Sequence, residues 1–169
     1  LATSGTAFSS KHAAALKKYT NRVILTYDSD TAGINAAIRT GYILMQNGFE
    51  VRVIDLEDGL DPDDFFKSPT NDTSSFKKLI KDAVHPINYI IHKKNILEKG
   101  ASERSNFLNE CIKEIKIIKD VIIRNDLIKR LSNELSVTES EILSRFNSIQ
   151  SKKTVNSKSV EHENTSIEH

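Results

Sequence analysis

Two short apolar runs with a helical segment between them restrict what the first third of this chain can fold into. Residues 22–27 form a run rich in β-branched side chains, and residues 51–56 form a second one. Over residues 34–45, apolar side chains recur at helical spacing, and Asn47-Gly48 supplies a C-terminal stop. Strand, helix and strand in this order predict a right-handed crossover and a parallel sheet. The first run is typical of a strand buried on both faces.

Helices are expected before and after this unit along the chain. Ser9 or Ser10 can cap a helix over residues 11–19. After residue 66 the apolar spacing becomes helical and stays so, with Pro86 placed to open one of the helices. Four apolar stripes result: Phe76, Leu79, Ile80 and Val84; Ile87, Ile90, Ile91 and Leu97; Leu108, Cys111, Ile112, Ile115 and Ile118; Leu127, Ile128, Leu131 and Leu135.

The end of the chain changes character. Thr138-x-x-Glu141 has the form of a capping box and predicts a short helix that includes Ile142 and Phe146. Residues 151–169 are almost entirely polar, which predicts a disordered tail or the start of a linker.

Composition excludes several classes of protein. No stretch of the 169 residues approaches the roughly 20 consecutive apolar residues of a membrane span. The single thiol, Cys111, suits a reducing compartment and hence the cytoplasm, and the five histidines show no zinc-binding spacing. The start has no signal-peptide pattern and no initiator Met, which indicates a fragment. The net charge of +1 conceals an acidic first third, net −3 over residues 1–66, and a basic remainder.

Acidic residues follow both predicted strands. Asp28 and Asp30 come after the first strand, and Asp61 and Asp63 come after the second. Ligands of parallel sheets bind outside the carboxyl ends of the strands, so the four carboxylates are expected at one edge. Hard oxygen donors of this kind suit Mg²⁺ or Mn²⁺.

A second interpretation of the same residues is structural. Asp30 can cap the helix that follows it, and Asp61 can cap a helix begun by Pro62, with Asp63 and Asp64 favoured by the helix dipole. For either pair alone the two interpretations are balanced, whereas both pairs together at adjacent strand ends favour a metal site. The neighbouring acids Asp55, Glu57 and Asp58 are expected to be solvated.

Other conspicuous residues have simpler explanations. Gly5-Thr6 could offer backbone amides to a phosphate, although a turn is the more common role of such a pair. Cys111 lies on an apolar stripe and is expected in the core, and His85 before Pro86 is expected in a turn. The basic residues of the helical part mostly fit solvated helix faces, with contact to nucleic acid as the alternative.

These motifs together resemble a known family. The resemblance is to the Toprim domain and the following helical subdomain of bacterial DNA primases of the DnaG type. Its motifs are Ser4-Gly5-Thr6-Ala7, Asp28-Ser29-Asp30-Thr31-Ala32-Gly33, Asp61-Pro62-Asp63-Asp64-Phe65 and Arg124-x-x-Leu127-Ile128-x-x-Leu131. It implies an α/β Toprim fold with a partial, Rossmann-like parallel sheet over residues 1–66. An all-α helical subdomain would follow over residues 67–150, before the tail or linker at 151–169.

The resemblance also implies a function. The family makes short RNA primers on single-stranded DNA with a Mg²⁺-dependent nucleotidyltransferase, a DNA-directed RNA polymerase. By matching position, Asp28, Asp30, Asp61 and Asp63 would be metal ligands, Asp28 and Asp30 would be catalytic, and Gly5-Thr6 would contact phosphate. The family's catalytic Glu is expected upstream of Leu1, so the chain alone is expected to be inactive.

The implied partners are single-stranded DNA and ribonucleoside triphosphates, together with a replicative helicase that binds a C-terminal domain outside this sequence. Zinc is implied only for an N-terminal domain outside it. Three alternatives stay open at this point. The chain could be part of another Toprim enzyme, such as a topoisomerase, a nuclease or a recombination mediator. It could be a haloacid-dehalogenase-type phosphatase, or a fragment that binds metal without catalysis.

Overall fold

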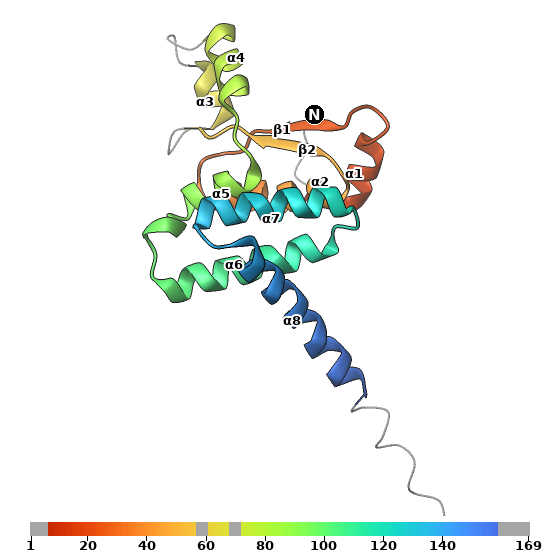
Figure 1. Cartoon of the computed structure of the whole chain (residues 1–169). Coiled ribbons are helices and arrows are strands. Elements are labelled where there is room, and N and C mark those ends of the chain that lie inside the picture. The colour runs from red at the N-terminus through yellow and green to blue at the C-terminus, as the bar shows by residue number, and fades with distance from the viewer. Residues whose placement is uncertain (1–6, 57–60, 68–71, 159–169) are drawn as a thin grey trace, which may run out of the picture.

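The computed structural model describes residues 7–56, 61–67 and 72–158, with side chains described as far as residue 148. Two strands lie among helices, and the described part of the chain ends in a helix that projects from the rest (Figure 1). The elements are α1 (Ser10–Leu16), β1 (Arg22–Leu25), α2 (Thr31–Gln46), β2 (Glu50–Val53), α3 (Pro62–Lys67), α4 (Thr73–Asp82), α5 (Pro86–Lys93), the 3₁₀ helix η1 (Ile96–Glu98), α6 (Ala101–Ile117), α7 (Val121–Leu135) and α8 (Glu139–Lys158).

The predicted strand–helix–strand unit is confirmed. β1 and β2 pair in parallel, with Leu25 opposite Val53, and the ladder continues where the Ile54 amide donates to the Leu25 carbonyl at 2.9 Å. Gly48 ends the connecting helix α2 with a φ of 74°, a conformation that favours glycine. The crossover through α2 therefore places the carboxyl ends of both strands at the same edge of the sheet.

Burial of the strands differs from the prediction of two buried faces. Leu25, Val51 and Val53 join the core, but Ile24 is 43% exposed. In the described part of the chain, the outward face of the two strands borders an open hollow, lined in part by Ile24, Arg52 and other side chains that do not enter the core. One face is packed and the other is open, so burial alternates along the strands.

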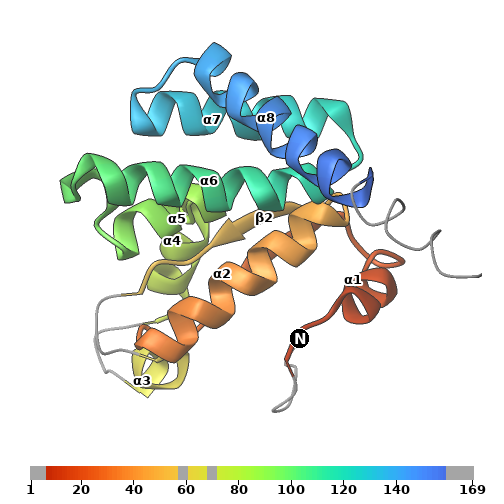
Figure 2. The same ribbon diagram turned by 90° about the horizontal axis from the view of Figure 1, so that it is seen from below.

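The helices after residue 72 build most of the core. Leu108, Cys111 and Ile112 of α6 are buried against apolar residues of α7 and α8, and Figure 2 shows α6 lying between that pair and α2. The predicted stripes are thus largely confirmed. The second stripe is shorter than expected, because α5 ends at Lys93 and Asn95 adopts a left-handed conformation before η1. Leu97 in η1 is consequently exposed.

The capping box at the start of α8 is confirmed. The Thr138 amide donates to Glu141 Oε2 at 3.0 Å, and the Glu141 amide donates to Thr138 Oγ1 at 3.3 Å. The helix is longer than predicted, since α8 continues past Gln150 to Lys158, and residues 159–169 lie outside the described part. Among the described helices, none combines the length and the apolar character that crossing a membrane requires.

His85 lies in the turn that enters α5, as expected, and its side chain is the N-cap of that helix. Its Nδ1 accepts a hydrogen bond from the Ile87 amide at 3.2 Å. Burial, with a smaller contribution from the positive charges of Arg130 and Arg52, lowers the pKa of His85 from 6.5 to about 3. The ring is therefore neutral in the folded protein at neutral pH.

This lowered pKa predicts a pH-dependent stability. Between pH 6.5 and about 3, the unfolded chain binds a proton at His85 that the folded chain does not bind. The free energy of unfolding should therefore fall as the pH falls through this window, by at most about 1.4 kcal/mol per pH unit from this group. The free energy of unfolding is measured by urea unfolding at several pH values. The variant His85→Asn keeps a capping acceptor, and its free energy of unfolding should change less with pH than that of wild type. The exposed His12→Gln control should keep the wild-type slope, and an unchanged slope in His85→Asn would contradict the assignment.

Candidate metal centre

The first pair of predicted ligands follows β1 and leads into α2. Asp30 is the N-cap of α2, and its Oδ1 accepts a hydrogen bond from the Gly33 amide at 2.6 Å. Asp28 and Asp30 are both exposed. The capping interpretation of Asp30 is therefore confirmed, and it occupies one of the two carboxylate oxygens, which is compatible with a second role for the other.

A close backbone approach holds this segment in place. A Cβ atom built on Gly33 would lie 2.2 Å from the Asp28 carbonyl oxygen. Only glycine allows the first turn of α2 to pack so tightly on the backbone of Asp28. The Asp-x-Asp-x-x-Gly pattern thus fixes the position of Asp28 relative to the helix that follows it.

The second pair of predicted ligands forms a compact group with one further acid. Asp61, Asp63 and Asp64 each offer a carboxylate oxygen, and these oxygens lie within 4.8 Å of one another. We call these three residues the acidic cluster; within the described ranges no other three His, Cys, Asp or Glu side chains meet this criterion. Asp61 also caps α3, since its Oδ1 accepts from the Asp64 amide at 2.6 Å.

A lysine of the same helix neutralises part of this charge. Lys67 Nζ lies 2.5 Å from Asp63 Oδ2 and 3.7 Å from Asp64 Oδ1. The hydrogen bond to Asp63, supported by its negative charge, raises the pKa of Lys67. Because all three side chains are largely exposed, these ion pairs contribute little to stability. They place one positive charge beside two of the three carboxylates.

The structure brings together part of the predicted ligand set. Asp61 and Asp63 meet, and Asp64 joins them, although the sequence suggested for Asp64 only an interaction with the helix dipole. Asp28 and Asp30 do not belong to this group of oxygens. The start of α2 and helix α3 nevertheless lie at the same end of the strands in both ribbon views (Figures 1 and 2). Gly5 and Thr6 lie outside the described residues.

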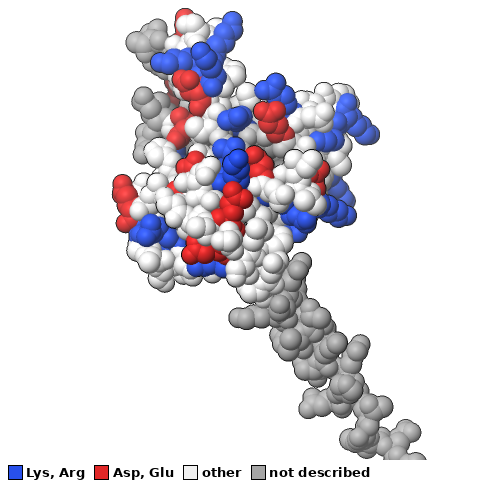
Figure 3. Space-filling view, in the orientation of Figure 1, with Lys and Arg blue, Asp and Glu red and all other residues white. Residues whose placement is uncertain are grey.

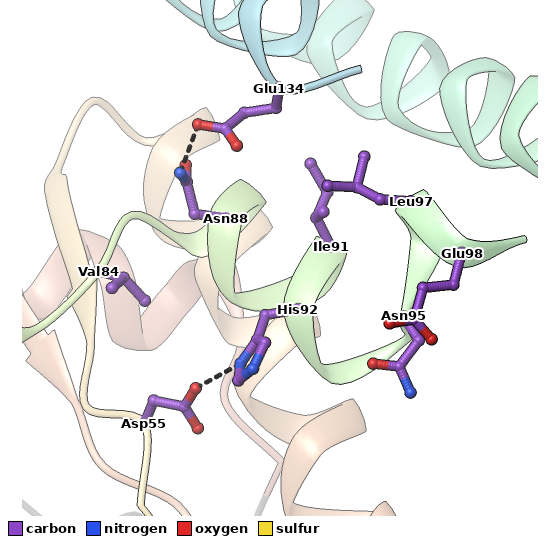
Figure 4. Close-up of a pocket in the computed structure, with 9 residues that line it drawn as sticks. All are labelled: Asp55, Val84, Asn88, Ile91, His92, Asn95, Leu97, Glu98 and Glu134. Atoms are coloured by element: carbon purple, nitrogen blue, oxygen red, sulfur yellow. Dashed lines mark hydrogen bonds and ion pairs between the residues drawn. The ribbon is translucent and has the colours of Figure 1, made fainter. Parts of the chain in front are cut away.

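The expectation that Asp55 is solvated is wrong. Its side chain is only 24% exposed. Its carboxylate forms a hydrogen bond with His92 Nδ1 and an ion pair with Lys93 Nζ, each at 2.8 Å. The contact with His92 is drawn in Figure 4, at the edge of a pocket that Asp55 and His92 help to line. Lys93 itself is 8% exposed, and nothing in the sequence separated it from the solvated lysines, such as Lys94 beside it. Glu57 and Asp58 lie outside the described residues.

The expectations for Cys111 and for most of the basic residues are confirmed. Cys111 is buried in the core, where burial raises the pKa of its thiol to about 12, so it is unreactive at neutral pH. Most basic side chains are on exposed helix faces. In the view of Figure 3, Lys and Arg side chains gather over α4, which carries the exposed Lys77, Lys78 and Lys81, with acidic side chains just below them.

Known proteins are similar to this chain in sequence and in fold. Residues 1–66 match the family described as Toprim-like. The DNA primase of Listeria innocua is 32% identical over 144 residues, which cover 82% of this chain but 22% of that primase. The chain therefore spans about a fifth of the length of this relative.

Solved structures agree in fold. A DNA primase domain from Pseudomonas aeruginosa matches 85% of this chain with a TM-score of 0.66 and 22% identity, and the match covers 46% of that domain. A DnaG primase catalytic domain bound to single-stranded DNA matches 81% of this chain with a TM-score of 0.65 and 23% identity, over 44% of its own length. The predicted fold class, a partial Toprim sheet followed by helices, is confirmed.

The tight packing at Gly33 yields a prediction. Gly33→Ala should lower the free energy of unfolding by about 1–3 kcal/mol, because the new Cβ must displace the Asp28 backbone. It should also shift the backbone amide NMR signals of Asp28 to Asp30. Gly100→Ala is the control, since a Cβ there meets nothing within 4 Å. It should lower the free energy of unfolding by less than about 1 kcal/mol. Equal effects of the two substitutions would contradict the role given to Gly33.

Proposed function

We propose that this chain, which is similar in sequence and fold to DNA primases of the DnaG type, supplies the metal-binding part of a primase catalytic core. The reaction would be Mg²⁺-dependent nucleotidyl transfer that makes short RNA primers on single-stranded DNA. The observation that carries the proposal is the acidic cluster at the carboxyl end of a parallel strand pair, within a Toprim-like fold.

The residues fit a divalent cation. The acidic cluster offers only carboxylate oxygens, the donors that Mg²⁺ and Mn²⁺ prefer. Asp61 uses one oxygen as a helix cap, and Asp63 shares one with Lys67, so each carboxylate still has a second oxygen to offer. We propose Asp61 and Asp63 as ligands, with Asp28 and Asp30 as further ligands at the end of β1.

The chemistry follows from this ligand set. A bound Mg²⁺ would neutralise the triphosphate of the incoming nucleotide and favour attack by the primer 3′ hydroxyl. In the proposed site, Asp28 and Asp30 would be the catalytic carboxylates. The Gly33 contact holds Asp28 in place, and a bound divalent cation would take the place of Lys67 beside Asp63.

The proposed partners follow the resemblance. One fold neighbour is a DnaG catalytic domain bound to single-stranded DNA, which supports a single-stranded DNA template for this chain. Ribonucleoside triphosphates would be substrates, and Gly5-Thr6 would contact their phosphates. A replicative helicase and a zinc ion would bind parts of the protein outside this sequence. We propose residues 1–66 as the Toprim part, 67–150 as the helical subdomain and 151–169 as a linker, working in the cytoplasm.

Metal binding can be measured on this chain directly. In a Mn²⁺ titration followed by electron paramagnetic resonance, Asp61→Asn/Asp63→Asn should weaken binding by at least about tenfold, because two carboxylate ligands are lost. Asp126→Asn/Glu110→Gln removes two exposed carboxylates elsewhere and should leave the affinity unchanged. Equal and negligible binding by wild type and Asp61→Asn/Asp63→Asn would refute the metal site.

The 169-residue chain and the longer protein should differ in primer synthesis. The 169 residues alone should make no primers on a single-stranded DNA template, since the catalytic Glu is expected upstream. In the longer protein, Asp28→Asn should lower primer synthesis by about 100-fold or more while single-stranded DNA binding persists. Asp126→Asn is the control. Template-dependent synthesis by the 169 residues would contradict the expected inactivity.

A further inference from the structure

The acidic cluster lies on a small hydrophobic cluster that is distinct from the main core. Ile54, Leu56, Phe65 and Ala83 are buried together, and Phe76 of α4 packs against them. Phe65 belongs to α3, which also carries Asp63 and Asp64. The position of the carboxylates therefore depends on how this small cluster is attached to the rest of the protein.

The attachment is made where β2 ends. Val53 and Val84 form an antiparallel bridge, with N–O distances of 2.8 and 2.9 Å. Both valines pack with the main core, whereas Ile54 and Leu56, which follow Val53, belong to the small cluster. The segment from Val53 to Leu56 thus crosses from one hydrophobic cluster to the other.

Side chains from the end of α5 bind this segment. Lys93 Nζ lies 2.8 Å from Asp55 Oδ1 and donates to the Leu56 carbonyl at 3.3 Å. His92 Nδ1 lies 2.8 Å from Asp55 Oδ2, and Figure 4 draws this contact as a dashed line. We call these contacts of Asp55, Leu56, His92 and Lys93 the Asp55 clamp. It ties two consecutive residues, one by its side chain and one by its backbone, to a helix of the main core.

Burial makes this clamp different from the surface ion pairs. The Lys93 side chain is 8% exposed, whereas the side chains of the Lys67–Asp63 pair are both more than half exposed. Removing an ammonium group from water is costly, and a buried ion pair is rarely a net source of stability over an apolar pair. What the contact does provide is a defined geometry, because the ion pair between Lys93 and Asp55 is combined with hydrogen bonds from Lys93 to the Leu56 carbonyl and between His92 and Asp55.

We propose that Lys93 and Asp55 are positioning residues for the acidic cluster. They fix the backbone at Leu56, and with it the small cluster that carries Asp61, Asp63 and Asp64, relative to the end of β1. The proposal rests on the proposed function, because it assigns the clamp to the metal site of that function. His92 is the outer, exposed member of the clamp, and its contribution is smaller than that of Lys93.

The test uses Mn²⁺ affinity and hydrogen exchange on the 169-residue chain. Lys93→Met should weaken Mn²⁺ binding about tenfold, the scale on which residues behind metal ligands act. It should also accelerate exchange of the Phe65 amide, which donates to the Asp61 carbonyl at 3.0 Å, while α6 amides such as Ile112 stay protected. Lys94→Met, which changes the adjacent exposed lysine, should alter neither measurement.

A second variant separates positioning from stability. Lys93→Met leaves the Asp55 charge unpaired, so Asp55→Asn/Lys93→Met is measured as well, with its melting temperature. If this variant melts like wild type and still shows weak Mn²⁺ binding and fast Phe65 exchange, the clamp positions the cluster. Wild-type Mn²⁺ affinity together with wild-type Phe65 exchange in this variant would overturn the proposal.

Failure of the proposed function gives a different result. If Asp61→Asn/Asp63→Asn binds Mn²⁺ as well as wild type does, the metal site is refuted whatever Lys93 does. Hydrogen exchange of the Phe65 amide is then the measurement that tests the role of the Asp55 clamp. Faster exchange in Asp55→Asn/Lys93→Met supports positioning of the acidic cluster by Lys93, and unchanged exchange overturns it.

Discussion

The parallel pairing of β1 with β2 is the constraint on which the rest of the structure depends. Because α2 carries the chain back along the sheet, both strands run in the same direction and both end at the same edge. The residues that follow them, Asp28 and Asp30 after β1 and the acidic cluster after β2, therefore lie at one end of the molecule. Antiparallel strands of the same sequence would place the two groups at opposite ends.

Capping and metal binding are compatible roles for the same carboxylates. Asp30 and Asp61 each use one oxygen to accept an amide hydrogen bond at a helix start, at 2.6 Å in both cases. The caps orient the carboxylates and leave each group a second oxygen that can bind a cation. The observed caps are therefore compatible with the metal binding that we propose for the same two groups. Lys67 lies beside Asp63 because the two residues are four positions apart on α3.

Local structure in this protein can be predicted from the sequence where it depends on neighbouring residues. The stop at Gly48, the capping box at Thr138 and the buried position of Cys111 were each predicted from neighbouring residues. The prediction was wrong where burial depends on distant parts of the chain. Ile24 has the sequence context of a buried strand, but in the described residues the face to which it belongs borders an open hollow.

The sequence by itself determined the order of strands and helices, the helix caps and the acidic residues that follow each strand, because each depends on residues a few positions apart. Only the tertiary structure decided which carboxylates meet. Asp64 joins Asp61 and Asp63 through one turn of helix, while Asp55 turns away to bind Lys93, which is 38 positions further along the chain. A buried ion pair between distant residues leaves no periodic signal in a sequence. Its partners are chosen by the packing of α5 against β2, which only the folded chain brings about.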